Sequence, residues 1–305
     1  GDVYKRQARS GPTGSTQGTW SSSEDGLSRI EWVIVAGLAL VWLPGMLALA
    51  EVYRTVEYAS HGFLVPLVAL WAATAHRDTL SRLEPVAPRA GRLLLVLLAP
   101  LAVVALLFRD PTLTGALWVS TVVAGVYALR GAAWVRTLKF PLGYLLFMIP
   151  LPAAWVTPLI VQLQMLVSNV AVRGLQAAGV AIYRDGNVLT LPGDRSLFVA
   201  EACSGITSLI TLLPIGVFVA YFSESVPWRR YAIVAAVVPI ALAGNLLRVV
   251  LTVWLAIEVD VEFATTGPLH EWAGVATYGI GCLCLLAFGG LLRWLTTGQT
   301  PPAPA

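Results

Sequence analysis

Residues 230–257 read RYAIVAAVVPIALAGNLLRVVLTVWLAI, and this stretch decides the fold class. A helix needs about twenty mostly apolar residues to cross the hydrocarbon core of a bilayer. Runs of similar length and composition recur along the chain, which predicts about eight transmembrane helices. They are residues 30–50, 58–75, 92–108, 112–129, 138–157, 203–223, 230–257 and 270–294.

The composition of the chain indicates the same class. Of 305 residues, 57% are hydrophobic and 12% are charged, whereas a soluble domain carries roughly 25% charged residues. The apolar excess must face lipid, so we predict an all-α, multi-pass integral membrane protein. The net charge of +3, from 20 Lys and Arg against 17 Asp and Glu, is too balanced for a nucleic-acid binder. Partners are therefore expected in or beside the bilayer.

The basic residues predict the orientation, because positively charged loops stay in the cytoplasm. We place the N-terminus inside and treat residues 158–180, which carry several polar side chains, as an interfacial helix. The acidic stretch 258–262 then lies outside, and making 158–180 a span would reverse this. The inner loops then hold Arg77, Arg82, Arg89, Arg92, Arg130, Arg136, Lys139, Arg229 and Arg230.

The chain divides into a tail, a membrane domain and a short stub. Residues 1–28 are rich in Gly, Ser and Thr and contain no apolar run, which is typical of a disordered tail. Residues 1–7 also resemble translated sequencing adapter, so part of this tail is expected to be artefactual. Residues 30–295 form the predicted membrane domain, and residues 296–305 form a flexible stub.

A small β-hairpin is expected just before the sixth span. Residues 187–191 and 196–200 alternate between apolar and polar side chains and flank a turn at Pro192 and Gly193. By the predicted orientation, this hairpin lies on the extracytoplasmic surface.

Arg248 lies inside the apolar run 240–257, where an unpaired cation costs a few kcal/mol. The span begins inside near Tyr231, and a rise of 1.5 Å per residue places Arg248 roughly 26 Å further across, close to the outer boundary. At that depth it can reach a substrate or a carboxylate. The alternative is a snorkelling arginine without chemistry. Asn245, three residues earlier on the same helix face, is placed to brace it.

Cys203 stands where the predicted hairpin gives way to the sixth span. The N–H groups and the dipole of a helix N-terminus favour the thiolate, which is the form of cysteine that attacks carbonyls. Gly205 would allow a substrate backbone to approach closely. The alternative is a small buried apolar residue, as expected for Cys282 and Cys284 deep in the last span. Three cysteines without a CxxC pair exclude a disulfide framework and a redox motif.

His270 opens the eighth span, again on the outer side. A histidine at such a boundary is often an interfacial or capping residue rather than a base. Its depth, however, coincides with that of Cys203 at the start of the sixth span and of Arg248 near the end of the seventh. A nucleophile, a base and a cation are therefore expected to meet in one pocket at the outer membrane face.

Five short motifs in the sequence resemble those of a known protein family. They are EACSGI at 201–206 followed by Ser208 and Leu209, GNLLRV at 244–249, His270 with Gly274, SHGFLVP at 60–66 and GNVLTLP at 186–192. Together they resemble the exosortase and archaeosortase family of multi-pass membrane transpeptidases, from about residue 30 to 295. Thr207 stands where members commonly have Arg, and Gly244 where they commonly have Ala.

The resemblance implies the roles of individual residues. Cys203 would be the nucleophile, His270 the acid and base, and Arg248 the cation that stabilises an oxyanion, with acyl transfer through a Cys thioester. No cofactor and no metal are implied. For His61, at the outer end of the second span, we expect a structural hydrogen bond near the active site or a contact with substrate. The supporting residues are Asn245, Ser204, Gly205 and His61.

The resemblance also implies a substrate and a location. Family substrates are exported proteins with a C-terminal signal made of a short Pro-Glu-Pro-like motif, a transmembrane helix and a basic tail. The acceptor would be an envelope polysaccharide or lipid. The protein would lie in the bacterial cytoplasmic (inner) membrane, with its active site on the periplasmic face.

Two other functions fit parts of the sequence. A multi-span solute transporter could use Arg248 as an anion site, although the chain shows neither an internal repeat nor paired broken helices. A plain peptidase that hydrolyses its thioester differs from a transpeptidase only in the product. A membrane acyltransferase and a structural scaffold are weaker options.

Overall fold

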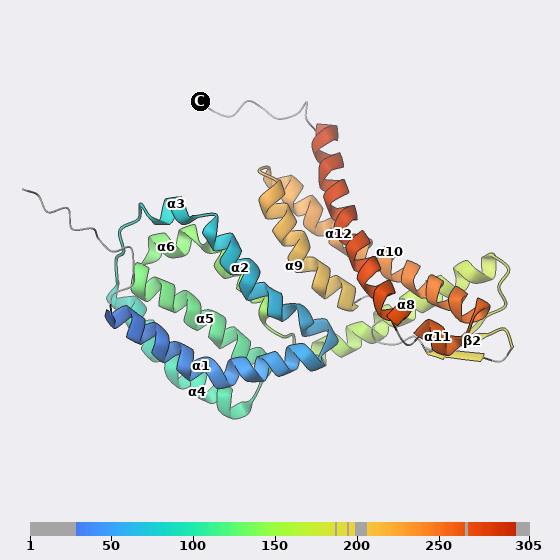
Figure 1. Ribbon diagram of the computed structural model, residues 1–305, viewed down its shortest axis with the longest axis horizontal. Helices are drawn as coiled ribbons and strands as arrows, with labels where there is room; N and C mark the ends of the chain where they lie inside the picture. The colour runs from blue at the N-terminus through green and yellow to red at the C-terminus, as the bar shows by residue number, and fades with distance from the viewer. Residues whose placement is uncertain (1–28, 187, 194, 199–205, 266–267, 297–305) are drawn as a thin grey trace, which may run out of the picture. The chain divides into compact units, whose positions relative to one another are not determined.

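The computed structural model in Figure 1 describes residues 29–186, 188–193, 195–198, 206–265 and 268–296. The contacts divide the chain into residues 1–41 and residues 42–305. The α-helices are α1 Arg29–Thr55, α2 Leu64–Thr74, α3 Arg77–Leu80, α4 Arg89–Phe108, α5 Pro111–Arg130, α6 Ala132–Thr137, α7 Lys139–Tyr144, α8 Ala153–Ala177, α9 Ile206–Ser223, α10 Pro227–Glu258, α11 Val261–Thr265 and α12 Pro268–Thr296. Two 3₁₀ helices are η1 Glu57–Phe63 and η2 Leu145–Met148.

Within the described ranges, seven helices are long and apolar enough to cross a membrane. They are α1, α4, α5, α8, α9, α10 and α12. Many of their large apolar side chains are exposed, as lipid-facing side chains would be. The predicted class, an all-α multi-pass membrane protein, is therefore confirmed.

The bounds of two predicted spans differ from the structure. Residues 58–75 form η1 and the 11-residue α2 instead of one long helix. The run 138–157 is broken between Met148 and Ala153, because Pro150 and Pro152 disfavour the helical conformation of the residues before them.

Residues 158–177 are helical, and their interfacial position stays a prediction. They make up most of α8, which we expected to be interfacial, and α8 qualifies as a span by length and composition. Its Pro158 lies within the first two turns of the helix. The sequence reading had assigned the apolar residues before Pro158 to the preceding span.

Helices α9, α10 and α12 lie side by side (Figure 1). Leu212 of α9, Val237 of α10 and Leu285 of α12 are buried in one apolar cluster. Gly216 of α9 faces Val237 so closely that an added Cβ would collide with it, so the small residue lets the helices approach. α9 also contains Pro214, which has no backbone N–H to donate.

Helix α10 is longer than a bilayer core is thick. Its 32 residues extend about 48 Å, whereas the hydrocarbon core measures about 30 Å and helix tilts range up to about 40°. The last turns packed against the sheet and α11 therefore exceed what the core can hold. Val253 and Ala256 of this end are buried with Leu189, Leu191 and Leu197 of the sheet.

The sheet has three antiparallel strands in the order β1-β2-β3, with bounds Tyr183–Asp185, Val188–Leu191 and Arg195–Phe198. The predicted hairpin is confirmed as β2 and β3, with Leu191 opposite Arg195. The sequence reading missed β1. Arg195 fastens the sheet to α10, because its guanidinium donates to the carbonyls of Ala256 (2.9 Å) and Ile257 (3.1 Å) in the last turn of α10.

A buried ion-pair network ties together α9, α10 and α12 at the other end of α10. Glu224, in the link between α9 and α10, has a side chain that is 2% exposed. Its carboxylate lies 3.7 Å from the guanidinium of Arg229 and 3.1 Å from that of Arg293 on α12. Arg230 donates to the backbone carbonyl of Glu224 at 2.6 Å. Charges removed from water this far need such partners.

Candidate active site

A pocket of about 570 Å³ brings together segments that are far apart in the sequence. η1 and the start of α2 form one side, and the first turns of α9 and α12 with the middle of α10 form the rest. The lining residues are Glu57, Ser60, His61, Leu64, Thr207, Ser208, Thr211, Arg248, Gly274, Val275 and Tyr278. We call this the polar pocket, because hydroxyl groups, a carboxylate and a guanidinium line it.

Arg248 reaches the polar pocket from α10, ten residues before the end of that helix. Gly274 of α12 lies directly beside it: a Cβ at position 274 would touch the guanidinium of Arg248 at the ordinary contact distance of 3.4 Å. Arg248 also lines an apolar groove of about 260 Å³ between α10, α11 and α12. The cation therefore lies between polar and apolar surroundings, where its field is screened less than in water.

Asn245 lies on α10, three residues before Arg248. Its exposed fraction is 0%, and it is among the largest fully buried side chains. Thr252, one turn beyond Arg248, donates its hydroxyl to the Arg248 carbonyl at 2.9 Å. Polar residues thus accompany Arg248 along this part of α10, as the sequence reading expected for Asn245.

Three hydroxyl residues of α9 face the polar pocket; the sequence analysis named two of them as motif positions without a role, and did not name Thr211. Thr207, Ser208 and Thr211 lie at positions i, i+1 and i+4, which share one side of a helix. Thr211 donates to the Thr207 carbonyl at 2.7 Å, and Tyr278 of α12 donates to the Thr211 carbonyl at 3.0 Å. The polar i, i+1, i+4 spacing in an otherwise apolar helix was the available signal.

His61 connects η1 to η2. Its Nε2 lies 2.9 Å from the carbonyl oxygen of Phe147, which can only accept, so Nε2 carries the hydrogen. η1 lies outside the seven span-length helices, and burial lowers the pKa of His61 below its ordinary value of 6.5. The ring is therefore neutral at pH 7.

The structure describes the predicted site only in part. His61 and Arg248 line the same pocket. Cys203, Ser204 and Gly205 lie outside the described residues. His270 belongs to the first turn of α12, four residues before Gly274, but its side chain lies outside the described part.

The other two cysteines and the possible metal ligands bear on chemistry other than that of the predicted triad. Cys282 and Cys284 lie on α12, the first half-buried and the second exposed, and neither lines the polar pocket. Among the described residues, no three His, Cys, Asp or Glu side chains gather so that they could hold a metal ion.

These features define a helical membrane protein with a polar, arginine-bearing pocket between its span-length helices. Residues 53–287 match the family model described as Transmembrane exosortase (Exosortase_EpsH), and the chain belongs to this family. The matched range includes every residue that lines the polar pocket. The family comprises membrane cysteine peptidases and transpeptidases that process sorting signals. Comparison with curated proteins and with solved structures gave no match.

Proposed function

We propose that this chain cleaves C-terminal sorting signals of exported proteins through Cys203 and transfers the cleaved protein to an envelope acceptor. The signal would contain a short Pro-Glu-Pro-like motif, a transmembrane helix and a basic tail. One observation carries the proposal: within the family match, the polar pocket gathers Arg248 with Thr207 of α9 and Gly274 of α12. Thr207 and Gly274 lie four positions after Cys203 and His270, respectively.

The covalent chain keeps Cys203 within reach of the pocket. Four residues separate it from Thr207, which lines the pocket, and an extended chain spans at most about 14 Å over that length. His270 lies one helical turn, about 6 Å along the axis, before the pocket residue Gly274. Both proposed reactive residues are therefore tethered close to Arg248.

The proposed reaction has two acyl transfers. The Cys203 thiolate attacks a peptide carbonyl, a C–S bond forms, and the Arg248 guanidinium stabilises the negative charge on the carbonyl oxygen. When the C–N bond breaks, protonated His270 gives its proton to the leaving amine. Neutral His270 then takes the proton of an acceptor hydroxyl, whose oxygen attacks the thioester and releases the Cys203 thiolate.

The proposed orientation follows from the charges. The polar pocket would open on the periplasmic side of the bacterial cytoplasmic membrane, and the N-terminus would lie inside. In this arrangement the α2 region makes one crossing and the chain between α5 and α9 makes one, so six crossings precede Glu224. Arg229, Arg230 and Arg293 gather around Glu224 at the opposite end of α10 from the sheet. A basic cluster at that end suits the cytoplasmic face.

The test is co-expression with a reporter that ends in the three-part signal, read by intact mass. We expect the full-length protein to remove the tail and Cys203→Ala and Cys203→Ser to leave it whole while accumulating equally in the membrane. Cys284→Ala is the matched control and should cleave normally. An added mass on the product identifies the acceptor, whereas a product bearing only water indicates a hydrolase.

A reporter that stays whole with every variant would contradict the proposal. Cleavage that survives Cys203→Ala would exclude Cys203 as the nucleophile. In either case, the transporter alternative would be tested next by anion uptake.

A further inference from the structure

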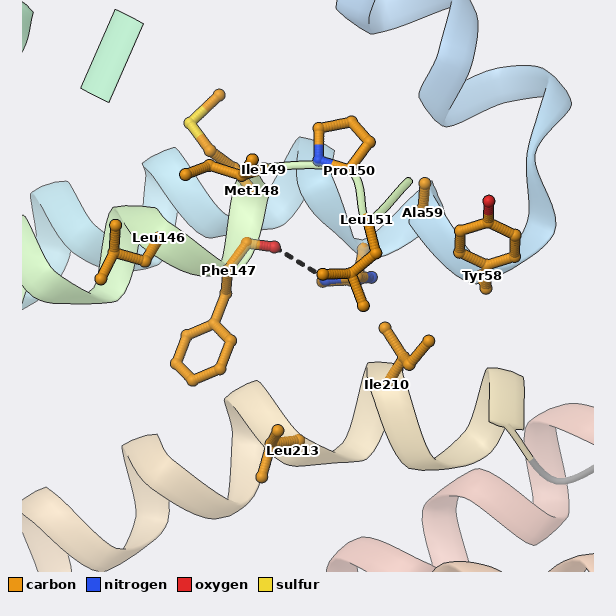
Figure 2. Close-up of a pocket in the computed structure, with 11 residues that line it drawn as sticks. Tyr58, Ala59, Leu146, Phe147, Met148, Ile149, Pro150, Leu151, Ile210 and Leu213 are labelled. Atoms are coloured by element: carbon orange, nitrogen blue, oxygen red, sulfur yellow. Dashed lines mark hydrogen bonds between the residues drawn. The ribbon is translucent and has the colours of Figure 1, made fainter. Parts of the chain in front are cut away.

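A second pocket, of about 190 Å³, is shown in Figure 2. Its walls are η1, the segment 146–151 and the face of α9 that carries Ile210 and Leu213. We call it the apolar pocket. Its lining residues are Tyr58, Ala59, His61, Leu146, Phe147, Met148, Ile149, Pro150, Leu151, Ile210 and Leu213. His61 lines both this pocket and the polar pocket, so the two are neighbours.

One wall of the apolar pocket is held firmly in place. The end of η2 and the chain that follows it leave several carbonyls without a helical partner, and side chains from three other elements supply the missing donors. His61 bonds the Phe147 carbonyl at 2.9 Å, and Tyr53 of α1 bonds that of Met148 at 2.6 Å. Thr112 of α5 bonds the carbonyl of Pro150 at 2.7 Å. A wall pinned this way keeps its shape, as a selective site requires.

The chemistry of the lining decides what the apolar pocket can take. Figure 2 shows Ile210 pointing from α9 toward segment 146–151, and Leu213 of the same helix also lines the pocket. Among the described residues that line this pocket, only His61 and Tyr58 have polar side chains, and the His61 N–H is already used by Phe147. A charged group entering here would lose its hydration without gaining a partner of opposite charge. A compact apolar group would gain contacts and lose little.

We propose that the apolar pocket is the specificity subsite for a compact apolar side chain of the sorting signal, next to the cleaved bond. The inference rests on the proposed function, because it needs a peptide in the polar pocket. The two pockets share His61 in their linings, and such neighbours suit consecutive or nearly consecutive residues of one extended peptide, which advances about 3.3 Å per residue. Ile210 sets the depth of the subsite.

The test uses a reporter panel and three variants of the full-length protein. The cleaved bond is first mapped by intact mass. Each of the two residues on either side of it is then set in turn to Ala, Val, Leu, Phe or Asp. Ile210→Ala enlarges the pocket and Ile210→Phe fills it. Ile215→Ala is the control, because it makes the same change on the same helix and Ile215 lines neither pocket.

At one position we expect wild type to prefer Val or Leu and to process Asp at least about 100-fold less efficiently in kcat/KM. Ile210→Ala should raise the Phe-to-Val ratio at that position about 10-fold, and Ile210→Phe should shift the preference to Ala. These are ratios between reporters, so they do not depend on how much variant folds. Ile215→Ala should keep the wild-type ratios.

Two failures are distinguishable. If cleavage is Cys203-dependent but Ile210→Ala alters all reporters by the same factor, the subsite is wrong and the proposed function stands. The same holds if no position responds, or if the change appears only in the yield of acceptor-bound product, as an acyl chain in the pocket would cause. If cleavage does not need Cys203, the proposed function itself fails.

Discussion

Helix α10 carries Arg229 in its first turn and Arg248 ten residues before its end, and the side chains of these two arginines have different surroundings. Arg229 has a side chain that is 9% exposed, and it pairs with the buried carboxylate of Glu224. Arg248, nineteen residues later and about 28 Å further along the helix, lines a pocket of about 570 Å³. The separation is close to the thickness of a bilayer core.

An arginine buried beside a carboxylate and an arginine that borders a cavity have different roles in the same helix. Around Glu224, α9, α10 and α12 are fastened together by charge. Around Arg248, the same three helices line a space that can receive a substrate. We therefore expect changes at the Arg229 end to act on stability and changes at the Arg248 end to act on catalysis.

The division of roles is tested most directly by making the same substitution at Arg248 and at Arg229. Arg248→Gln should lower kcat/KM for reporter cleavage about 10²- to 10³-fold, the usual loss when one oxyanion donor is removed. Its thermal unfolding in detergent should stay within a few degrees of wild type. The measurement is reporter cleavage per amount of folded protein, together with Tm.

Arg229→Gln is the matched control and should show the reverse pattern. The folded fraction should cleave the reporter at nearly the wild-type rate, while Tm falls. Equal catalytic losses in the two variants would mean that α10 simply tolerates no change, and the division of roles would be wrong.

Glu224→Gln should have the next largest effect. It leaves Arg229 buried without its counter-charge, and breaking a buried pair in this way costs about 3 kcal/mol or more. Arg293 adds less, because half of its side chain is exposed and solvent screens it. Denaturant unfolding in detergent measures the loss. A variant as stable as wild type would show that the network does not hold the three helices.

His61→Gln tests how a residue that lines the polar pocket makes the stability of the protein depend on pH. Because burial lowers the pKa of His61, the unfolded chain takes up a proton near pH 6.5 and the folded chain only at lower pH. Wild type should therefore lose stability as the pH falls below about 6.5. Glutamine keeps an N–H donor for Phe147 and removes this titration.

Thermal unfolding of both proteins between pH 5 and pH 8 checks the His61 prediction. The wild-type curve should fall on the acid side, and the His61→Gln curve should fall less. Two parallel curves would mean that other groups account for the acid sensitivity.

Tyr278→Phe should have the smallest effect. It removes only the hydroxyl that donates to the Thr211 carbonyl at 3.0 Å, and one such bond contributes about 1 kcal/mol. Reporter cleavage should fall by less than about 10-fold. A loss as large as that of Arg248→Gln would show that the hydroxyl itself takes part in the reaction.

The sequence was sufficient for features that follow from apolar length and local turn chemistry. The spans, the β2–β3 hairpin and the exceptional position of Arg248 all have local signals. It was insufficient where apolar residues continue through a break in structure. The run 138–157 looks like one span because Pro150 and Pro152 interrupt the helix without interrupting its hydropathy. Strand β1 is only three residues long and carries two charged residues, so no alternation marked it.

Contacts between distant residues set the other limit. His61 and Phe147 are 86 positions apart, and no local pattern announces that one will bond the carbonyl of the other. The apolar pocket exists because η1, segment 146–151 and α9 converge, and each is unremarkable in isolation. Cys203 and His270 as reactive groups remain predictions from motif and topology, because the described side chains do not include theirs.

Pro214 lies between the part of α9 that lines the two pockets and the part that leads to the Glu224 network. Without an N–H at position 214, the carbonyl of Ile210 loses its usual partner one turn later, so the backbone ladder of α9 is interrupted there. The interruption separates the residues that face the two pockets, from Thr207 to Leu213, from those that lead to the anchored Glu224. The part of α9 before Pro214 can therefore shift when substrate binds, while the part after Pro214 keeps its position.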